Sequence, residues 1–148
     1  MQKQDTYRIL VLDGQGGGIG GRLVRLLSER IPEGCALMCV GTNALATSTM
    51  LKAGAKQGAT GENAVIYNAG RADLILGPIG MILANGILGE VSPAMAAAVS
   101  GAEAVKILIP SASCGVRIAG TGELRLEELL LDAVDRAGQE IARCRQTE

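Results

Sequence analysis

The residues best suited to chemistry lie near the N-terminus, where a short apolar run ends in Asp13 and six glycines follow within eight residues. Backbone N–H groups approach a phosphate closely only where no Cβ intervenes, and the first turn of a following helix adds unpaired donors. Apolar residues recur at helical spacing after the glycines as far as Pro32, which predicts that helix. We therefore expect a strand, a phosphate-binding loop and a helix, although a tight turn without a ligand would use the same residues.

Histidine is absent from the sequence, so the commonest general base and the commonest metal ligand are missing. Cys35 and Cys39 are predicted to share one face of a strand, whereas Cys114 and Cys144 stand alone. Without a C-x-x-C pair, reduced cysteines of this kind are usually small core residues. We expect no metal site. Cys114 is the one plausible nucleophile, and the sequence pairs no base with it.

The composition narrows the possible partners. With 148 residues, a net charge of −1 and an isoelectric point near 5.5, the chain has the size of one domain. It lacks the basic surface that nucleic acid or an anionic membrane requires, and only two tyrosines could stack on bases. No signal peptide is visible in the polar N-terminus. We expect a cytoplasmic protein with an N-terminal tail at residues 1–7 and a nucleotide-binding domain at residues 8–148.

Alternating strands and helices are predicted to position the glycine loop. Strand-like runs occur at residues 8–13, 36–41, 73–77 and 105–109, with a short last strand expected at 116–119. Helix signals include an N-cap at Thr42 or Asn43 with a stop at Gly54, a Ser92-Pro93 start, and an apolar stripe near the C-terminus. This order predicts a three-layer, Rossmann-like α/β sandwich in one domain, with about five mostly parallel strands.

One stretch does not fit this scheme. Residues 64–68 and 73–77 both have the composition of strands, but only residues 69–72 separate them. A parallel crossover needs about a dozen residues or more. Residues 64–68 are therefore expected either to form a hairpin with the next strand or to cross at the edge of the sheet.

The candidate binding residues follow the expected strands. Because the carboxyl ends of parallel strands share one edge, where open α/β sheets bind ligands, these residues are expected to meet there. They are Asp13, Gly14, Gln15, Gly16, Gly17, Gly18, Ile19, Gly20, Thr42, Asn43, Gly77, Pro78 and Ser111, with Asn68 added only if its strand is parallel. Such a set suits hydrogen bonds to ribose or amide groups, but it is also typical of turns. Asp13 could contact a ligand or brace the loop by accepting from its N–H groups.

From Arg8 onward, the sequence resembles a small bacterial family known only as a domain of unknown function. The stretches that carry the resemblance are DGQGGGIG, GTNALATSTMLKAGA, GATGEN and ADLILGPIG. They cover nearly the whole chain. The resemblance implies a Rossmann-like fold and brings no activity with it.

A second, local resemblance concerns short-chain dehydrogenases. Residues 14–20 are similar to the cofactor loop of those enzymes, and residues 68–70 to their Asn-Ala-Gly segment. The loop resemblance implies contact with the pyrophosphate of NAD or NADP, with another nucleotide as the alternative. The catalytic Tyr-x-x-x-Lys pair is absent, since Tyr67 is followed at that spacing by Arg71. Thr42 and Asn43 also stand where NAD sites usually carry an acidic residue and NADP sites often an arginine.

Three functions remain compatible with these residues. The favoured one is a nucleotide-binding module, such as a sensor or accessory subunit, with no chemistry of its own. The second is a small enzyme, either a cofactor-dependent reductase or a transferase acting on a phosphorylated metabolite. Its reactive candidates would be Asp13, Ser113 or Cys114. The third is a structural oligomer without a ligand.

Self-association is expected from residues 74–89, sixteen residues without a charge. The helix breakers Pro78, Gly80 and Gly86 make a membrane span improbable. The apolar side chains after Pro78 exceed what one helix face on a sheet can cover, which favours a homodimer or larger oligomer. The alternative is that the helix beginning near Ser92 covers this segment within one subunit.

Overall fold

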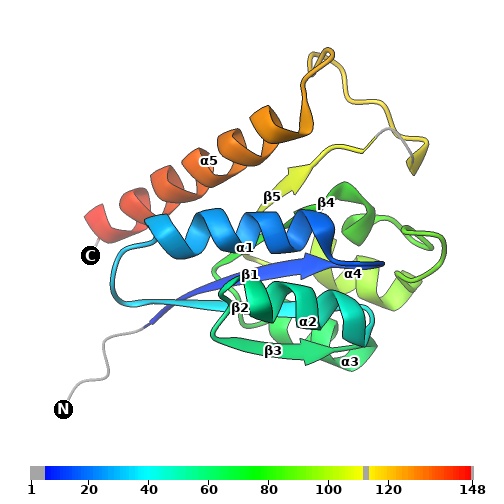
Figure 1. Ribbon diagram of the computed structural model, residues 1–148, viewed down its shortest axis with the longest axis horizontal. Helices are drawn as coiled ribbons and strands as arrows, with labels where there is room; N and C mark the ends of the chain where they lie inside the picture. The colour runs from blue at the N-terminus through cyan, green and yellow to red at the C-terminus, as the bar shows by residue number, and fades with distance from the viewer. Residues whose placement is uncertain (1–5, 112–113, 148) are drawn as a thin grey trace.

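Strand β1 (Tyr7–Asp13) lies at the centre of a five-stranded sheet in the computed structural model, which describes residues 6–111 and 114–147. The strand order is β3-β2-β1-β4-β5, and every neighbouring pair is parallel (Figure 1). The other strands are β2 (Cys35–Gly41), β3 (Gln57–Thr60), β4 (Leu74–Pro78) and β5 (Val105–Ile109). The predicted Rossmann-like α/β class is confirmed.

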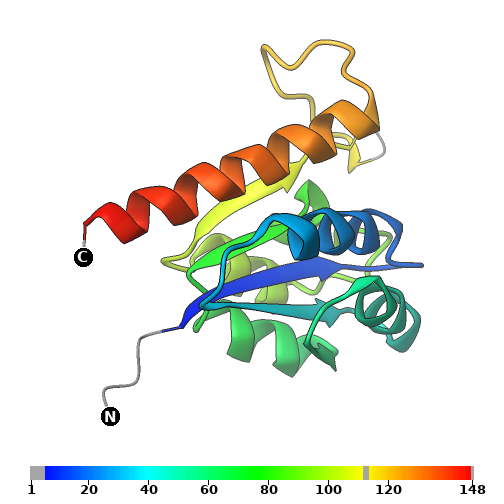
Figure 2. The same ribbon diagram turned by 60° about the vertical axis from the view of Figure 1, so that its left-hand side comes forward.

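Helices cover both faces of the sheet. They are α1 (Gly18–Arg30), α2 (Ala44–Ala53), α3 (Glu62–Ala69), the 3-10 helix η1 (Ile79–Ile82), α4 (Pro93–Ser100) and α5 (Leu126–Gln146). Alternate residues of β1 enter different cores, because successive strand side chains point to opposite faces. Ile9 and Val11 pack with α1 and α5, whereas Leu10 and Leu12 pack with α3 and α4. Figure 2 shows α5 along one side of the sheet and α3 along the other.

The prediction of a strand at residues 64–68 is wrong. These residues belong to α3, which buries Val65 and Ala69, four apart on one face. The strand that sequence reasoning missed is β3, whose residues QGAT are all at least partly exposed and show no apolar alternation. The parallel crossover into β4 therefore starts at β3 and runs through α3. The four residues 69–72 do not have to connect two parallel strands.

The other boundaries follow local chemistry. The Asn43 side chain accepts from the Ala46 N–H and caps α2, and Gly54 ends that helix with φ 130°. Ser92 caps α4 with Pro93 as its first residue, as expected. No strand forms at residues 116–119, which belong to the irregular connection between β5 and α5 (Figure 1). The apolar stripe of α5 is buried from Leu130 to Ile141.

Candidate functional site

Asp13 ends β1 and braces the glycine loop from inside the protein. The residue is 5% exposed. Oδ1 accepts from the N–H of Gly14 at 2.8 Å and Oδ2 from the N–H of Gly20 at 2.7 Å. Burial is the largest influence and raises the pKa of this carboxyl above its usual value, although the two N–H groups lower it. Asp13 therefore holds the two ends of the loop together.

The glycines of the loop fall into two groups. Gly17 has φ 72°, and a Cβ there would lie 2.8 Å from the Ala46 carbonyl oxygen. A Cβ on Gly20 would lie 2.8 Å from the Asp13 Cβ. Gly16 and Gly18 differ, since a Cβ on either would meet nothing within 4 Å. Close packing therefore explains why Gly17 and Gly20 are glycines, but it does not explain why Gly16 and Gly18 are.

Gly16 and Gly18 also carry free donors. Both residues are exposed, and neither N–H has a hydrogen-bond partner within the part of the chain that the structure describes. The two donors lie at and just before the N-terminus of α1, where the helix dipole favours negative charge. The protein thus leaves open the side of the loop that a phosphate would approach.

A second carboxylate, Glu90, reaches the same edge from a distant part of the chain. It belongs to residues 83–91, which we call the strap. The Glu90 carboxylate accepts from the Gln15 N–H at 3.1 Å, from the Thr42 hydroxyl at 2.8 Å and from Asn43 Nδ2 at 2.8 Å. Asn43 Nδ2 also donates to the Gln15 carbonyl oxygen at 2.9 Å. The ends of β1 and β2 therefore present three donors to one anionic group.

These hydrogen bonds decide the acidity of Glu90. Partial desolvation raises the pKa of its carboxyl, but the hydrogen bonds from Asn43, Thr42 and the Gln15 N–H together outweigh it, and the pKa lies below its usual value. Glu90 is thus held as a carboxylate at neutral pH.

Ile87 of the strap fills the space between the ends of β1 and β4. A Cβ on Gly14 would lie 3.2 Å from Ile87 Cγ2, and one on Gly80 would lie 2.9 Å from Ile87 Cγ1. Gly14 directly follows β1, and Gly80 lies in η1 after β4. The chain reverses its direction across the sheet between these two strands, and open α/β sheets bind ligands at that point. The strap therefore covers the expected ligand crevice.

The structure brings together most of the predicted site residues. Residues 14–20, Thr42 and Asn43 gather beside Asp13. Gly77 is buried in β4, where a Cβ would meet the Leu12 carbonyl oxygen at 2.5 Å, and Pro78 precedes η1. Ser111 lines a separate cavity of about 190 Å³ with Ile79.

Asn68 is the exception. It lies near the C-terminal end of α3, donates to the Ala64 carbonyl oxygen and lines a cavity beside Arg8 and Ala36, at the amino ends of β1 and β2. Asn68 was expected among the loop residues only if residues 64–68 formed a parallel strand, and that condition is not met because they belong to α3.

The family follows from comparison with known sequences. A family model described as Domain of unknown function (DUF3842) matches residues 8–142. The chain belongs to this family. No curated protein sequence matches it significantly.

The DUF3842 chain is similar in fold to a solved flavoprotein. That structure is described as a dodecameric FMN-dependent UbiX-like decarboxylase from Escherichia coli O157:H7. The TM-score is 0.50 and the sequence identity 16%, over 90% of this chain and 94% of the other. At this identity the similarity shows the fold alone.

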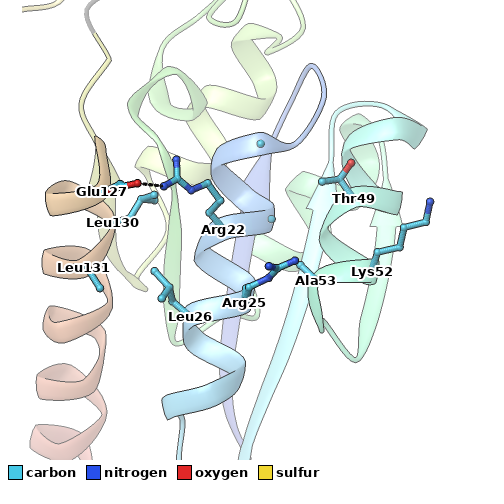
Figure 3. Close-up of a pocket in the computed structure, with 11 residues that line it drawn as sticks. Arg22, Arg25, Leu26, Thr49, Lys52, Ala53, Glu127, Leu130 and Leu131 are labelled. Atoms are coloured by element: carbon cyan, nitrogen blue, oxygen red, sulfur yellow. Dashed lines mark ion pairs between the residues drawn. The ribbon is translucent and has the colours of Figure 1, made fainter. Parts of the chain in front are cut away.

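A cavity of about 620 Å³ adjoins the open side of the glycine loop in this DUF3842 protein (Figure 3). It lies between α1, α2 and α5, and Gly18 belongs to its lining. Arg22, Arg25 and Lys52 make it cationic, and within residues 6–111 and 114–147 only Arg22 of the three has an ion-pair partner, Glu127 at 3.5 Å. Sequence reasoning missed this cavity because its residues look like the solvated faces of separate helices.

Glu90 was also missed, although one signal could have indicated it. It is the only charged residue between Asp73 and Glu103. A single carboxylate in so long an apolar stretch needs a hydrogen-bonded partner when the stretch folds against the sheet. The sequence gives no indication which partner that is.

Two of the expected reactive groups, Asp13 and Cys114, lie among the described residues, and Asp13 accepts from the loop N–H groups. The Cys114 thiol donates to the Ser111 carbonyl oxygen at 2.9 Å, and Ser113 lies outside the described residues. Within residues 6–111 and 114–147, no group of three or more potential ligand side chains could hold a metal ion. No helix in those ranges is long and apolar enough to cross a membrane.

Proposed function

We propose that this protein binds a phosphate-bearing small molecule of the nucleotide class at the carboxyl edge of its sheet. The observation that carries the proposal is the pair of N–H groups at Gly16 and Gly18, which have no hydrogen-bond partner among the described residues. A Cβ on either glycine would meet nothing within 4 Å, and Gln15 of the same loop is one of three donors to Glu90. Packing explains the other glycines but gives no reason for these two. A phosphate against the loop would supply that reason, because it would stand where a Cβ would otherwise project.

Flavin mononucleotide is the first ligand to test. The similar fold belongs to a protein described as FMN-dependent, and FMN carries a single phosphate monoester that one loop could hold. The dinucleotides NAD and NADP, expected from the glycine pattern, are the next candidates. An acidic side chain for a ribose is available beside the end of β2, but it comes from Glu90 rather than from the residues after that strand.

The favoured role is a binding module rather than an enzyme with its own acid–base pair. Asp13 is engaged by the loop, and the donors of Thr42 and Asn43 are directed to Glu90. Any redox chemistry would therefore come from the bound cofactor, while the chain would bind and orient it.

Substitution of Gly18 tests the proposal. Gly18→Val should fold normally, since the added side chain begins in open space, but it should weaken FMN binding at least tenfold by blocking the phosphate. Gly138→Val is the matched control, because Gly138 is also exposed on a helix with nothing within 4 Å of a Cβ. Binding is measured by quenching of flavin fluorescence and folding by the unfolding temperature. Equal affinity in folded Gly18→Val and Gly138→Val proteins would exclude the loop as the phosphate site.

We also propose that the protein self-associates, but through less of residues 74–89 than the sequence indicated. Ile79 and Met81 are buried within the chain, and α4 packs against η1. Leu88, at the tip of the strap, is 92% exposed. Leu88→Asp should lower the mass measured by light scattering after size exclusion. An unchanged mass, or a monomeric parent protein at tens of micromolar, would contradict this.

A further inference from the structure

The strap closes a loop whose C-terminal end, Val91, is buried in the core. The Asn85 N–H donates to the Val91 carbonyl oxygen at 2.8 Å, and the Val91 N–H donates to that of Gly86 at 3.1 Å. Between these bonds the chain turns through three non-glycine residues with positive φ: Asn85 at 61°, Ile87 at 53° and Leu88 at 52°. A β-branched residue such as Ile87 rarely adopts this conformation, and it persists only where the surroundings hold it.

Two side chains attach the strap to the glycine-loop edge. Ile87 packs between Gly14 and Gly80, and Glu90 accepts from Gln15, Thr42 and Asn43. Leu88 lies between them in sequence and is almost fully exposed. Glu90 is the only one of the three that uses donors a ligand could also use.

The donors that hold Glu90 are suited to a phosphate. A backbone N–H, a hydroxyl and a side-chain amide all donate to one carboxylate, and such groups bind phosphate oxygens equally well. The Gln15 N–H belongs to the same loop as the free donors of Gly16 and Gly18. A phosphate dianion arriving there would meet the negative charges of Glu90 and the nearby Asp13, with Asp13 buried and fixed by its own hydrogen bonds.

We propose that the strap is a displaceable cover, and that the Glu90 carboxylate occupies in the free protein the subsite that the ligand's phosphate takes on binding. This inference rests on the proposed nucleotide-binding function. Binding exchanges one anion for another at Gln15, Thr42 and Asn43, while withdrawal of Ile87 opens the crevice between β1 and β4. The competing arrangement keeps Glu90 in place as an acceptor for a ligand hydroxyl.

The two arrangements predict opposite effects of Glu90→Gln. If Glu90 is a competitor, only the uncovered fraction of the protein can bind FMN, and the apparent affinity is lowered in proportion. Removing the charge of Glu90 should raise that fraction and tighten FMN binding at least tenfold. Riboflavin, which lacks the phosphate, should gain less. Glu103→Gln makes the same charge change at an exposed residue before β5 and should leave both affinities unchanged. Unchanged or weaker FMN binding in Glu90→Gln would overturn the cover.

A second variant and a ligand-free measurement complete the test. Ile87→Ala weakens the second contact of the strap with the glycine-loop edge without altering charge, and it should also tighten FMN binding. In the free Glu90→Gln protein, the amide hydrogen of Gln15 should exchange faster than in Glu103→Gln, because Glu90 is its acceptor. Unchanged exchange would contradict the attachment.

The outcomes separate the two proposals. FMN binding that Gly18→Val abolishes but neither strap variant strengthens would remove the cover and leave the nucleotide site intact. If the parent protein and both strap variants fail to bind FMN, NAD and inorganic pyrophosphate, both proposals are wrong.

Discussion

Asp13 and Glu90 place two carboxylates at the same edge of the sheet, and both accept hydrogen bonds from backbone N–H groups of the glycine loop. They differ in origin and in surroundings. Asp13 is buried and accepts from the loop that directly follows it, whereas Glu90 comes from 75 residues beyond Gln15 and remains partly exposed. The pKa of Asp13 is raised because burial outweighs its hydrogen bonds, while the pKa of Glu90 is lowered because its hydrogen bonds outweigh desolvation.

This difference indicates which of the two carboxylates water or a ligand anion can replace. Removing Asp13 leaves two buried donors without acceptors, and water cannot readily replace it. Of the donors around Glu90, Gln15 is exposed and Thr42 and Asn43 are partly exposed, so water or a ligand anion can reach them. We therefore assign Asp13 to the fold and Glu90 to the control of access.

The largest expected effect is that of Asp13→Ala. Leaving the N–H groups of Gly14 and Gly20 unpaired should lower the free energy of unfolding by about 2–4 kcal/mol, as measured by urea denaturation. Asp135→Ala is the control, because its exposed ion pair with Arg30 is worth at most about 1 kcal/mol. If the two variants are equally stable, Asp13 does not brace the loop.

The next largest effect is expected from the loop glycines, whose substitution should change stability by different amounts in the two groups. Gly20→Ala brings a Cβ within 2.8 Å of the Asp13 Cβ and 2.6 Å of Met50 Sδ, which should destabilise the protein by about 1–3 kcal/mol. Gly16→Ala should change stability by less than about 0.5 kcal/mol, since nothing lies within 4 Å. Thermal unfolding of both variants measures the contrast. A destabilised Gly16→Ala would show that packing also fixes the open part of the loop.

A smaller, pH-dependent effect is expected at Glu90. Its pKa is lower in the folded protein than the unfolded value of about 4.3. Its contribution to stability is therefore fully present above that value and is lost as the pH falls through the folded pKa. Compared with Glu90→Gln, the parent protein should be more stable by about 1 kcal/mol at pH 7 and no more stable once the pH has fallen below the folded pKa of Glu90. A stability difference that is constant with pH would show that the Glu90 charge is not held by these donors.

Asp13 should respond to pH in the opposite direction. Its folded pKa is raised, so protonation favours the folded state, and its contribution becomes less favourable as the pH rises through the raised pKa. The two carboxylates can thus be distinguished by the sign of their pH dependence.

Local signals in the sequence were sufficient for much of the fold. The glycine loop before α1 and the Ser92-Pro93 start of α4 depend on neighbouring residues, and each could be predicted. The cap of α2 was narrowed to Thr42 or Asn43, and the structure has Asn43 there. Strand β3 could not, since QGAT lacks apolar alternation and pairs only because β2 provides an edge. Residues 64–68 contain β-branched side chains, but tertiary packing of Val65 and Ala69 places them in a helix.

Only the part of the candidate site that is local in sequence could be predicted. Asp13 and the glycines are adjacent in sequence, so the loop and the bracing role were among the expectations. Glu90 and the cationic cavity of Arg22, Arg25 and Lys52 form only when separate elements meet. No pattern within a short window contains that information.

The most direct test of the central claim is to follow the backbone amide resonances of Gly16 and Gly18 by NMR during titration with FMN and, separately, with riboflavin. These ligands differ only in the phosphate. The account predicts that FMN shifts both resonances strongly, whereas riboflavin leaves them nearly unchanged. Equal shifts with both ligands, or FMN shifts confined to Arg22, Arg25 and Lys52 in the neighbouring cavity, would contradict a phosphate site at the glycine loop.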